Sequence, residues 1–393
     1  MSEKCSRRMT SGILPQFSGT ICSMFKRRVE QLKEKIKNEK LDAVLVSSVS
    51  NISYLSGFTN FSKDEREAYI FLGKNFQYII TDGRYSEAVE KQISHLELFE
   101  RGNEKSTEEL FKKHKKEIKT LGIEEDNLTV AEFKTVKKHF KNIKHFNVSH
   151  LRSAKTDDEI KRIKKACQIG DLAFKYILKK IKVGVTEKEI AGELKKFIKE
   201  NGAEFSFPAI VAFGKNSSIP HHQTGNTKLK DGDTVLLDLG AKVENYCSDM
   251  TRTVFFGSPI NKQSLRSVDL KQRKIYRVVL EAQQKAVDFI NRTTKGSKEI
   301  KAQEVDRVAR EYIRSQGFPD IPHSLGHGVG LEVHEHPSLS PKSRDILKEG
   351  MVFSIEPGIY LPNFGGVRIE DLFVLEKNGL RQLTNSDKKL FFI

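Results

Sequence analysis

The most informative part of this sequence is a pair of predicted β-strands, Thr234-Val-Leu-Leu-Asp-Leu-Gly-Ala241 and Tyr246-Cys-Ser-Asp-Met-Thr-Arg-Thr-Val-Phe255. A short connection joins them into a hairpin, and a turn centred just after Val243 sets Asp238 directly opposite Asp249. Residues opposed on one sheet face lie ~4.5–5.5 Å apart at Cβ, and like charges there repel. Asp238 also lies in an apolar strand that we expect to be buried. Two such carboxylates require a shared proton or a cation between them.

A second pair of acidic residues occurs in the same arrangement near the end of the chain. The predicted strands are 351–357 and 366–373, and pairing about Asn363 sets Glu356 opposite Glu370. Two facing acid pairs in corresponding places favour a metal centre over chance. Four buried carboxylates can hold two divalent ions of the Mn, Mg, Co or Zn type. Two ions ~3.5–4 Å apart form a known hydrolytic clamp.

Histidines supply a nitrogen ligand for such a centre. Four of the eleven histidines lie in the segment 323–336. His327 stands between two glycines, which allow close backbone approach, and we predict that it is a ligand. We expect His323 and His334 to orient ligands or to transfer protons. We interpret His336 as a surface residue of a polar loop.

The order of helix and strand signals predicts two domains and a leader. Residues 1–23 are Ser-rich with almost no acids, and we expect a disordered leader ending before Met24. Residues 24–150 predict an α/β domain, and 151–393 predict a second domain in which helix, helix and strands occur twice. Its expected helices include 270–292 and 302–316, and Thr156–Glu159 and Thr186–Glu189 are predicted capping boxes. In the first domain we expect a helix at 27–40, strands at 42–47, 68–72 and 76–81, and a turn-rich segment at 51–57.

Composition narrows the class of protein. The chain has 393 residues, 37% hydrophobic and 31% charged, which excludes wholesale disorder. No run reaches ~18 apolar residues, so the sequence predicts no membrane span. Four cysteines without CxxC spacing favour a reducing cytoplasm. The net charge of +16 we attribute to a solvated Lys-rich surface rather than to a nucleic-acid partner.

The motifs together resemble the creatinase/aminopeptidase P/prolidase family of metallopeptidases. The resemblance covers about 24–393 and implies a creatinase-like N-terminal domain followed by a pita-bread catalytic domain with pseudo-twofold symmetry. The matching strings are Asn51–Phe58, Ile219-Pro-His221, Leu237–Ala241, Ser248–Thr253, Gly326–Gly330 with Val333-His334, Ile355–Ile359 and Val367–Asp371.

The resemblance also implies a role for each matched residue. Two divalent ions are expected, with Mn as the first choice and Co or Zn as alternatives. Asp238 would chelate one ion, Asp249 and Glu370 would bridge both, and His327 and Glu356 would complete the second. Glu356 would also act as the base, His221 and His334 would contact the substrate carbonyl, and His323 and Arg368 would shape the site. The chain departs from many relatives at His222, where they carry Tyr.

The resemblance implies a cytoplasmic aminopeptidase that hydrolyses the Xaa-Pro bond behind a free N-terminus by attack of a metal-bridged hydroxide. Its partners would be peptides with proline at the second position, and a homodimer is common in the family. The ligand motifs also fit an Xaa-Pro dipeptidase (prolidase). We expect the aminopeptidase because the strings at 248–253 and 356–360 look more like those of bacterial Xaa-Pro aminopeptidases.

Two further alternatives are a non-catalytic binding module on the same fold and a creatine hydrolase. Relatives that serve as binding modules lose metal ligands, and creatine hydrolases work without metal. This chain keeps all five ligand positions together with His221 and His334, so the sequence argues against both.

Overall fold

The computed structural model describes residues 19–102, 105–257 and 270–389 of the chain. The chain forms two compact units, and the boundary between them lies between Val148 and Ser149. Among the described residues, no helix has both the length and the hydropathy that crossing a membrane requires.

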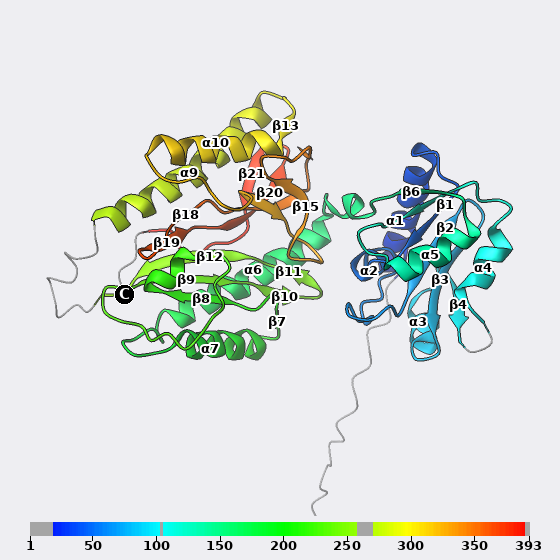
Figure 1. Cartoon of the computed structure of the whole chain (residues 1–393), viewed down its shortest axis with the longest axis horizontal. Helices are drawn as coiled ribbons and strands as arrows, with labels where there is room; N and C mark the ends of the chain where they lie inside the picture. Colours follow the sequence, from blue (N-terminus) through cyan, green and yellow to red (C-terminus); the bar gives the residue numbers. More distant parts are fainter. Residues whose placement is uncertain (1–18, 103–104, 258–269, 390–393) are drawn as a thin grey trace, which may run out of the picture. The chain divides into compact units, whose positions relative to one another are not determined.

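The first unit contains one mixed sheet of six strands in the order β4-β3-β2-β1-β5-β6. The predicted hairpin is present as β2 and β3, in which Tyr69 pairs with Ile80. β5 pairs in parallel with β1, β6 with β5, and β4 with β3. Helices connect these strands (Figure 1). The elements are α1 (Gly19–Asn38), β1 (Ala43–Val46), α2 (Val49–Ser56), β2 (Tyr69–Gly73), β3 (Gln77–Asp82), α3 (Ser86–Gln92), β4 (Glu97–Arg101), α4 (Thr107–His114), β5 (Thr120–Ile123), α5 (Val130–His139) and β6 (Asn142–His145).

The turn-rich segment predicted at 51–57 is wrong, because these residues form most of helix α2. Ile52 and Leu55 are fully buried on this helix, so tertiary packing outweighs the turn signals of its Ser and Asn residues. Gly57 ends the helix at a φ of 81°, a left-handed conformation that glycine adopts freely.

The predicted leader is wrong over its last residues, because 19–23 belong to helix α1. No proline and no further glycine occurs between Gly19 and the end of the helix, so nothing in the sequence stops it at Met24. The rest of the predicted leader lies outside the described residues. Val29, Leu32 and Ile36 are buried, as the predicted apolar stripe requires.

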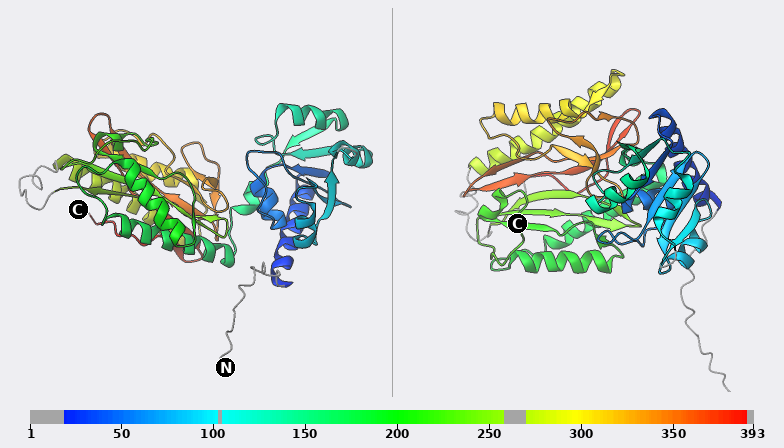
Figure 2. Two further views of the ribbon diagram at one scale, coloured as in Figure 1. Left: turned by 90° about the horizontal axis from the view of Figure 1, so that it is seen from below. Right: turned by 45° about the vertical axis from the view of Figure 1, so that its right-hand side comes forward.

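The second unit repeats one pattern: two helices followed by antiparallel strands. The first half pairs β8, β9 and β12, and the second half pairs β14, β17 and β20. The strands lie between α9 and α10 on one side and α7 on the other (Figures 1 and 2). The helical elements are η1 (Ser149–Arg152), α6 (Asp157–Ile177), α7 (Glu187–Glu200), η2 (Gly214–Ser218), α9 (Leu270–Lys295) and α10 (Ala302–Ser315). The strands are β7 (Glu204–Phe205), β8 (Ile210–Phe213), β9 (Thr234–Leu239), β10 (Ala241–Val243), β11 (Tyr246–Cys247), β12 (Met250–Phe255), β13 (Ile300–Lys301), β14 (Gly326–Gly328), β15 (Glu335–Leu339), β16 (Ile346–Leu347), β17 (Val352–Ile355), β18 (Gly358–Leu361), β19 (Gly365–Arg368), β20 (Asp371–Glu376) and β21 (Gly379–Gln382).

Both predicted capping boxes are confirmed. The hydroxyl of Thr156 accepts a hydrogen bond from the backbone N–H of Glu159 at the start of α6. Thr186 and Glu189 form the same reciprocal pair at the start of α7. Each box satisfies N–H groups that have no partner within the helix, and it fixes the residue at which the helix begins.

The register predicted for the first hairpin is wrong by two residues. Asp238 pairs with Thr251, and the pairings on both sides of Asp249 place that residue level with Gly240. The turn centres on Glu244 and Asn245, whose φ angles of 48° and 69° are those of a two-residue type I′ turn. A shift of two residues leaves every side chain on the same face of the sheet. Asp238 and Asp249 are therefore diagonal neighbours rather than an opposed pair.

The register predicted for the second acid pair is confirmed. Ile355 pairs with Asp371 and Gly358 pairs with Arg368, and these pairings lie on either side of the two glutamates. The same register places Glu356 opposite Glu370, each just beyond the end of a strand.

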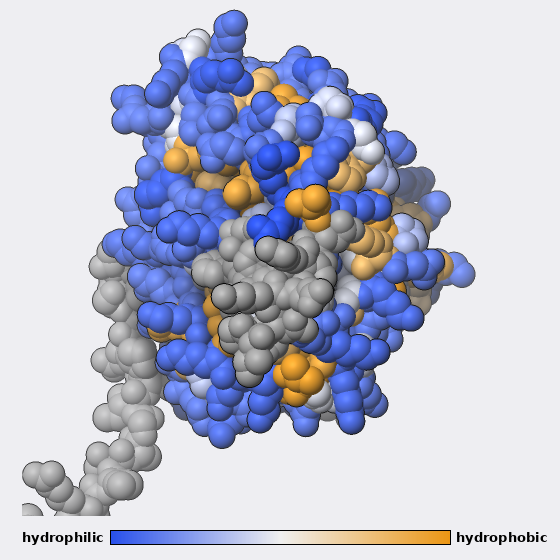
Figure 3. Space-filling view, turned by 90° about the vertical axis from the view of Figure 1, so that its left-hand side faces the viewer, coloured by the Kyte–Doolittle hydropathy of each residue, from blue (hydrophilic) through white to orange (hydrophobic). Residues whose placement is uncertain are grey.

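The surface of the second unit is mainly hydrophilic on the face shown in Figure 3. Where the residues are coloured, hydrophobic ones lie among hydrophilic ones. Single exposed hydrophobic residues are normal on protein surfaces and carry no functional signal.

Candidate metal centre

The structure brings the predicted ligands together at the middle of the second unit. Asp249, His327 and Glu370 each offer a ligand atom, and these atoms lie within 4.8 Å of one another. His327 Nε2 lies 3.2 Å from Glu356 Oε1 and 3.7 Å from Asp249 Oδ2. Asp238 is buried close enough for its charge to affect Asp249 and Glu370. The two halves of the repeat thus contribute to one cluster.

Glycine allows the backbone of His327 to enter this cluster. A Cβ at Gly326 would lie 2.0 Å from the carbonyl oxygen of Ser354, and one at Gly328 would lie 2.2 Å from that of His336. Any side chain at either position would force the neighbouring strands apart. The two glycines therefore fix β14 against its neighbours and hold the imidazole in place.

The acidic residues repel one another. Burial, and then the negative charges of Glu370 and Asp238, raise the pKa of Asp249 well above its usual range. Burial and the charges of Glu356 and Asp238 do the same to the pKa of Glu370. Burial also opposes ionisation of Glu356, but the hydrogen bond and charge of His327 outweigh it and lower its pKa to about 2. Full ionisation of all four acids requires additional positive charge.

Two buried carboxylate oxygens indicate where a cation would bind. Asp238 Oδ1 and Glu370 Oε1 are buried and have no hydrogen-bond partner in the described part of the chain. An unpaired buried acceptor is costly, and coordination of a cation removes the cost. Carboxylate oxygens combined with one imidazole suit Mn, Co or Zn. The residues present therefore fit a pair of divalent ions.

Arg368 holds residues of the cluster in place through hydrogen bonds. Its Nη2 donates to Asp238 Oδ2 over 2.6 Å, and its Nε donates to Thr251 Oγ1 over 3.0 Å. Its Nη1 donates to Tyr360 Oη over 2.9 Å and to the carbonyl of Pro220 over 3.3 Å. The guanidinium is buried, and each of its three nitrogens donates a hydrogen bond. Arg368 therefore positions the residues around it and has no nitrogen left for a substrate.

Two supporting residues were missed by the sequence analysis. Thr251 donates from Oγ1 to Glu370 Oε2 over 2.7 Å. Tyr360 Oη lies 2.8 Å from His323 Nε2 and links that histidine to Arg368. The strand register is the signal that could have found Thr251, because Thr251 stands directly opposite Asp238 once the turn is placed correctly.

The remaining predicted histidines lie around the cluster. The ring of His334 meets that of His327 edge to face, with centroids 4.3 Å apart. His334 and His221 are both exposed, whereas the carboxylate ligands Asp238, Asp249 and Glu370 are buried. His323 contacts Tyr360 and through it is linked to Arg368.

Glu187 holds the loop that carries His221. Its buried carboxylate accepts hydrogen bonds from the backbone of Phe213 and from the side chain of Asn216, each over 2.8–2.9 Å. It also accepts from His222 Nε2 and from the backbone of Gly225, both over 2.9 Å. His222, the position at which the chain departs from the family pattern, is therefore occupied in holding its own loop.

Comparisons with known proteins divide the chain in the same way. Residues 161–377 match metallopeptidase family M24, and residues 28–154 match the creatinase/prolidase N-terminal domain. An Xaa-Pro dipeptidase of Pyrococcus horikoshii is 38% identical over 371 residues, which cover 92% of this chain and 98% of the relative.

Solved structures show the same likeness over both units. An Xaa-Pro dipeptidase from Bacillus anthracis has a TM-score of 0.84 at 35% identity, covering 94% of this chain and 100% of that one. An X-Pro aminopeptidase from Thermotoga maritima has a TM-score of 0.76 at 32% identity, covering 93% of this chain and 100% of that one.

Proposed function

The chain belongs to metallopeptidase family M24, and on that premise we propose that it is an Xaa-Pro dipeptidase, which hydrolyses the bond before proline in dipeptides. The membership confirms the predicted resemblance and the predicted fold class, an α/β chain with a pita-bread second domain. The choice of dipeptidase replaces the aminopeptidase expected from the motif strings. It is supported by relatives named Xaa-Pro dipeptidase at 38% and 35% identity.

The observation that carries the proposal is the buried acidic cluster with its two unpaired carboxylate oxygens. Two divalent ions there would supply Lewis-acid polarisation of the scissile carbonyl and an activated water. The proposed ligands are Asp238, Asp249, His327, Glu356 and Glu370, and manganese stays the predicted metal with cobalt or zinc as alternatives.

The chain's own residues divide the remaining work. We assign Glu356 as the proton acceptor, because the resemblance implies this role and its Oε1 lies in the cluster, 3.2 Å from His327 Nε2. His221 and His334 lie at the exposed rim, where a substrate carbonyl can reach them. Imidazole N–H groups there would donate hydrogen bonds to the oxygen on which negative charge develops during attack.

A dipeptidase must also recognise the free carboxylate directly after proline. Arg368 is not available for this task, because its Nε and both terminal nitrogens already donate to Asp238, Thr251, Tyr360 and Pro220. His222 is likewise bound to Glu187. We therefore assign carboxylate recognition to the exposed rim of the site rather than to Arg368 or His222.

The test compares three substrates that share the first two residues: Ala-Pro, Ala-Pro amide and Ala-Pro-Ala. The proposal predicts rapid hydrolysis of Ala-Pro and at least tenfold lower kcat/KM for the other two, because only Ala-Pro presents a carboxylate directly after proline. Equal or faster cleavage of Ala-Pro-Ala would contradict the dipeptidase assignment. Cleavage of Ala-Ala at the rate of Ala-Pro would contradict the selectivity for proline.

The second candidate is the Xaa-Pro aminopeptidase. It is favoured by the likeness to the Thermotoga maritima enzyme over 93% of the chain. The same assay separates the two activities. A reducing cytoplasm and a homodimer stay predictions from the sequence.

A further inference from the structure

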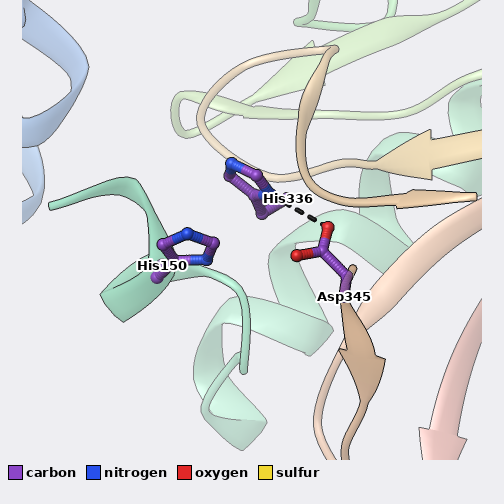
Figure 4. A group of neighbouring side chains, drawn as sticks. All are labelled: His150, His336 and Asp345. Atoms are coloured by element: carbon purple, nitrogen blue, oxygen red, sulfur yellow. Dashed lines mark hydrogen bonds and ion pairs between the residues drawn. The ribbon is translucent and has the colours of Figure 1, made fainter. Parts of the chain in front are cut away.

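Three potential metal ligands meet in the second unit outside the acidic cluster. His150 comes from η1, His336 from β15, and Asp345 directly precedes β16 (Figure 4). Each offers one ligand atom, and these atoms all lie within 4.8 Å of one another. Segments far apart in the sequence thus place two imidazoles and one carboxylate side by side.

His336 is not the plain surface residue expected from the sequence. Its side chain is 35% exposed, and its Nδ1 lies 3.0 Å from Asp345 Oδ2. Its ring also faces that of His150, with centroids 4.1 Å apart. A metal ion binds an imidazole through its unprotonated nitrogen, and each of these two rings offers one such ligand atom.

Hydrogen bonds hold Asp345 in place and favour its ionised form. Its Oδ2 accepts a hydrogen bond of 2.7 Å from the backbone N–H of Ser338. Its own backbone N–H donates to Ser343 Oγ over 3.1 Å, which fixes the residue at the start of β16. Burial opposes ionisation of Asp345, but the bonds from His336 and Ser338 outweigh it and lower its pKa. The group therefore carries negative charge toward the two imidazoles.

We propose that His150, His336 and Asp345 form an additional site for one divalent ion of the zinc class, with a fourth position left to water. Metal–nitrogen and metal–oxygen bonds of about 2.0–2.1 Å place tetrahedral ligands about 3.3 Å apart. The His336–Asp345 separation of 3.0 Å already fits that spacing. The ligand atom of His150 lies within 4.8 Å of those of His336 and Asp345, and the exposure of His150 provides an entry path for the ion.

The ligand types determine the class of ion. Two imidazoles with one carboxylate suit Zn²⁺, Co²⁺, Ni²⁺ or Cu²⁺ better than Mg²⁺ or Ca²⁺. The acidic cluster, in contrast, is rich in oxygen and has a single histidine. The two sites therefore differ in their preferred metals, and the additional site does not depend on the proposed peptidase activity.

A metal ion at this site would link η1 to the segment that carries His334. His336 stands two residues after His334, and the same segment is already tied to η1 by ion pairs of Arg152 with Glu335 and Glu332, over 2.7 and 2.8 Å. A bound ion would add a second tie between η1 and this segment. Because binding to the folded form alone stabilises it, Zn²⁺ should raise the melting temperature through this site.

The test counts bound zinc in the full chain after equilibrium dialysis against Zn²⁺. Four proteins are compared: wild type, His150→Gln, His336→Gln and the control His145→Gln, an exposed histidine of the first unit. The expected result is one ion per chain fewer in the His150 and His336 variants, with no loss in the control. Because the result is the difference in bound zinc between wild type and variant, it does not depend on how many ions the acidic cluster holds.

Co²⁺ provides a second measurement, because a tetrahedral cobalt site absorbs visible light. The proposal predicts a component of the Co²⁺ spectrum that is present in wild type and absent in His150→Gln, whose exposed position makes misfolding a poor explanation. Equal zinc counts in all four proteins would overturn the proposal. Loss of an ion in His336→Gln but not in His150→Gln would also overturn it, since the three-ligand site requires both.

Discussion

Arg368 Nη2 donates a 2.6 Å hydrogen bond to Asp238 Oδ2, and both side chains are buried. This pair joins β19 to β9, and so joins the two halves of the repeat at the acidic cluster. Burial raises the pKa of Asp238, and the positive charge of Arg368 opposes that rise. Arg368 thus helps to keep Asp238, a proposed metal ligand, ionised, whereas the negative charge of Glu356 opposes its ionisation.

Replacing Arg368 with Gln should destabilise the metal-free protein. Breaking a buried ion pair by removing one partner costs about 3–5 kcal/mol, because the other charge stays buried. The matched control is Arg381→Gln, whose pair with Glu376 has side chains 39% and 47% exposed and is worth about 0–1 kcal/mol. Urea unfolding followed by circular dichroism measures both, since the chain has no Trp for fluorescence. Equal costs for the two variants would contradict the role given to Arg368.

His221→Ala should lower kcat on Ala-Pro by ~10²–10⁴-fold, as expected for loss of a group that stabilises charge in the transition state. Metal content, measured by atomic emission, should stay at the wild-type level, because His221 is exposed at the rim and is not assigned as a ligand. His145→Ala, in the first unit, should change neither quantity. A His221 variant that loses metal would show that this residue is a ligand.

Glu187→Gln should impair catalysis through the position of His221. The amide cannot accept all four hydrogen bonds that the carboxylate accepts, and a bond to a charged acceptor is worth about 1.5–3 kcal/mol. We expect kcat/KM to fall by ~10–100-fold, an effect of about 1.4–2.8 kcal/mol, with metal content unchanged. The control is Glu189→Gln, an exposed capping-box residue on the same helix. If both variants behaved alike, the effect would belong to helix stability and not to the loop.

The turn at Glu244 and Asn245 provides a test of the first hairpin's register. Asn245→Val should cost about 1–2 kcal/mol, because a β-branched residue resists the observed φ of 69°. Asn245→Gly should leave stability unchanged or slightly higher, since glycine adopts positive φ freely. Thermal unfolding by circular dichroism compares the two. Equal destabilisation by Val and Gly would mean that backbone conformation does not fix this turn.

The sequence predicted what depends on local chemistry and pattern. The capping boxes at Thr156 and Thr186 follow from one side chain and its neighbour three residues on, and both are present. The register of the second acid pair followed from a turn centred on Asn363, and the structure has that register. The four proposed acidic ligands could be picked out of the sequence because carboxylates in strands expected to be buried are costly, and His327 because glycines flank it.

What the sequence could not predict depends on backbone conformation and on distant contacts. The first hairpin was misplaced because Glu244 adopts a positive φ that is uncommon for its residue type. Tyr360 looks like an ordinary strand residue, and only the folded chain brings its hydroxyl between His323 and Arg368. His150 precedes His336 and Asp345 by a long stretch of sequence, so nothing in the sequence pairs them.

The central claim is that the acidic cluster is a two-metal hydrolytic centre, and metal reconstitution tests it most directly. Protein stripped by chelation is titrated with Mn²⁺ while bound metal and Ala-Pro hydrolysis are measured together. The His150→Gln background removes the additional site from the count. The account predicts no activity in the stripped protein, a plateau at two bound ions per chain, and no recovery in Asp249→Asn. Full activity without metal, or after a single bound ion per chain, would contradict it.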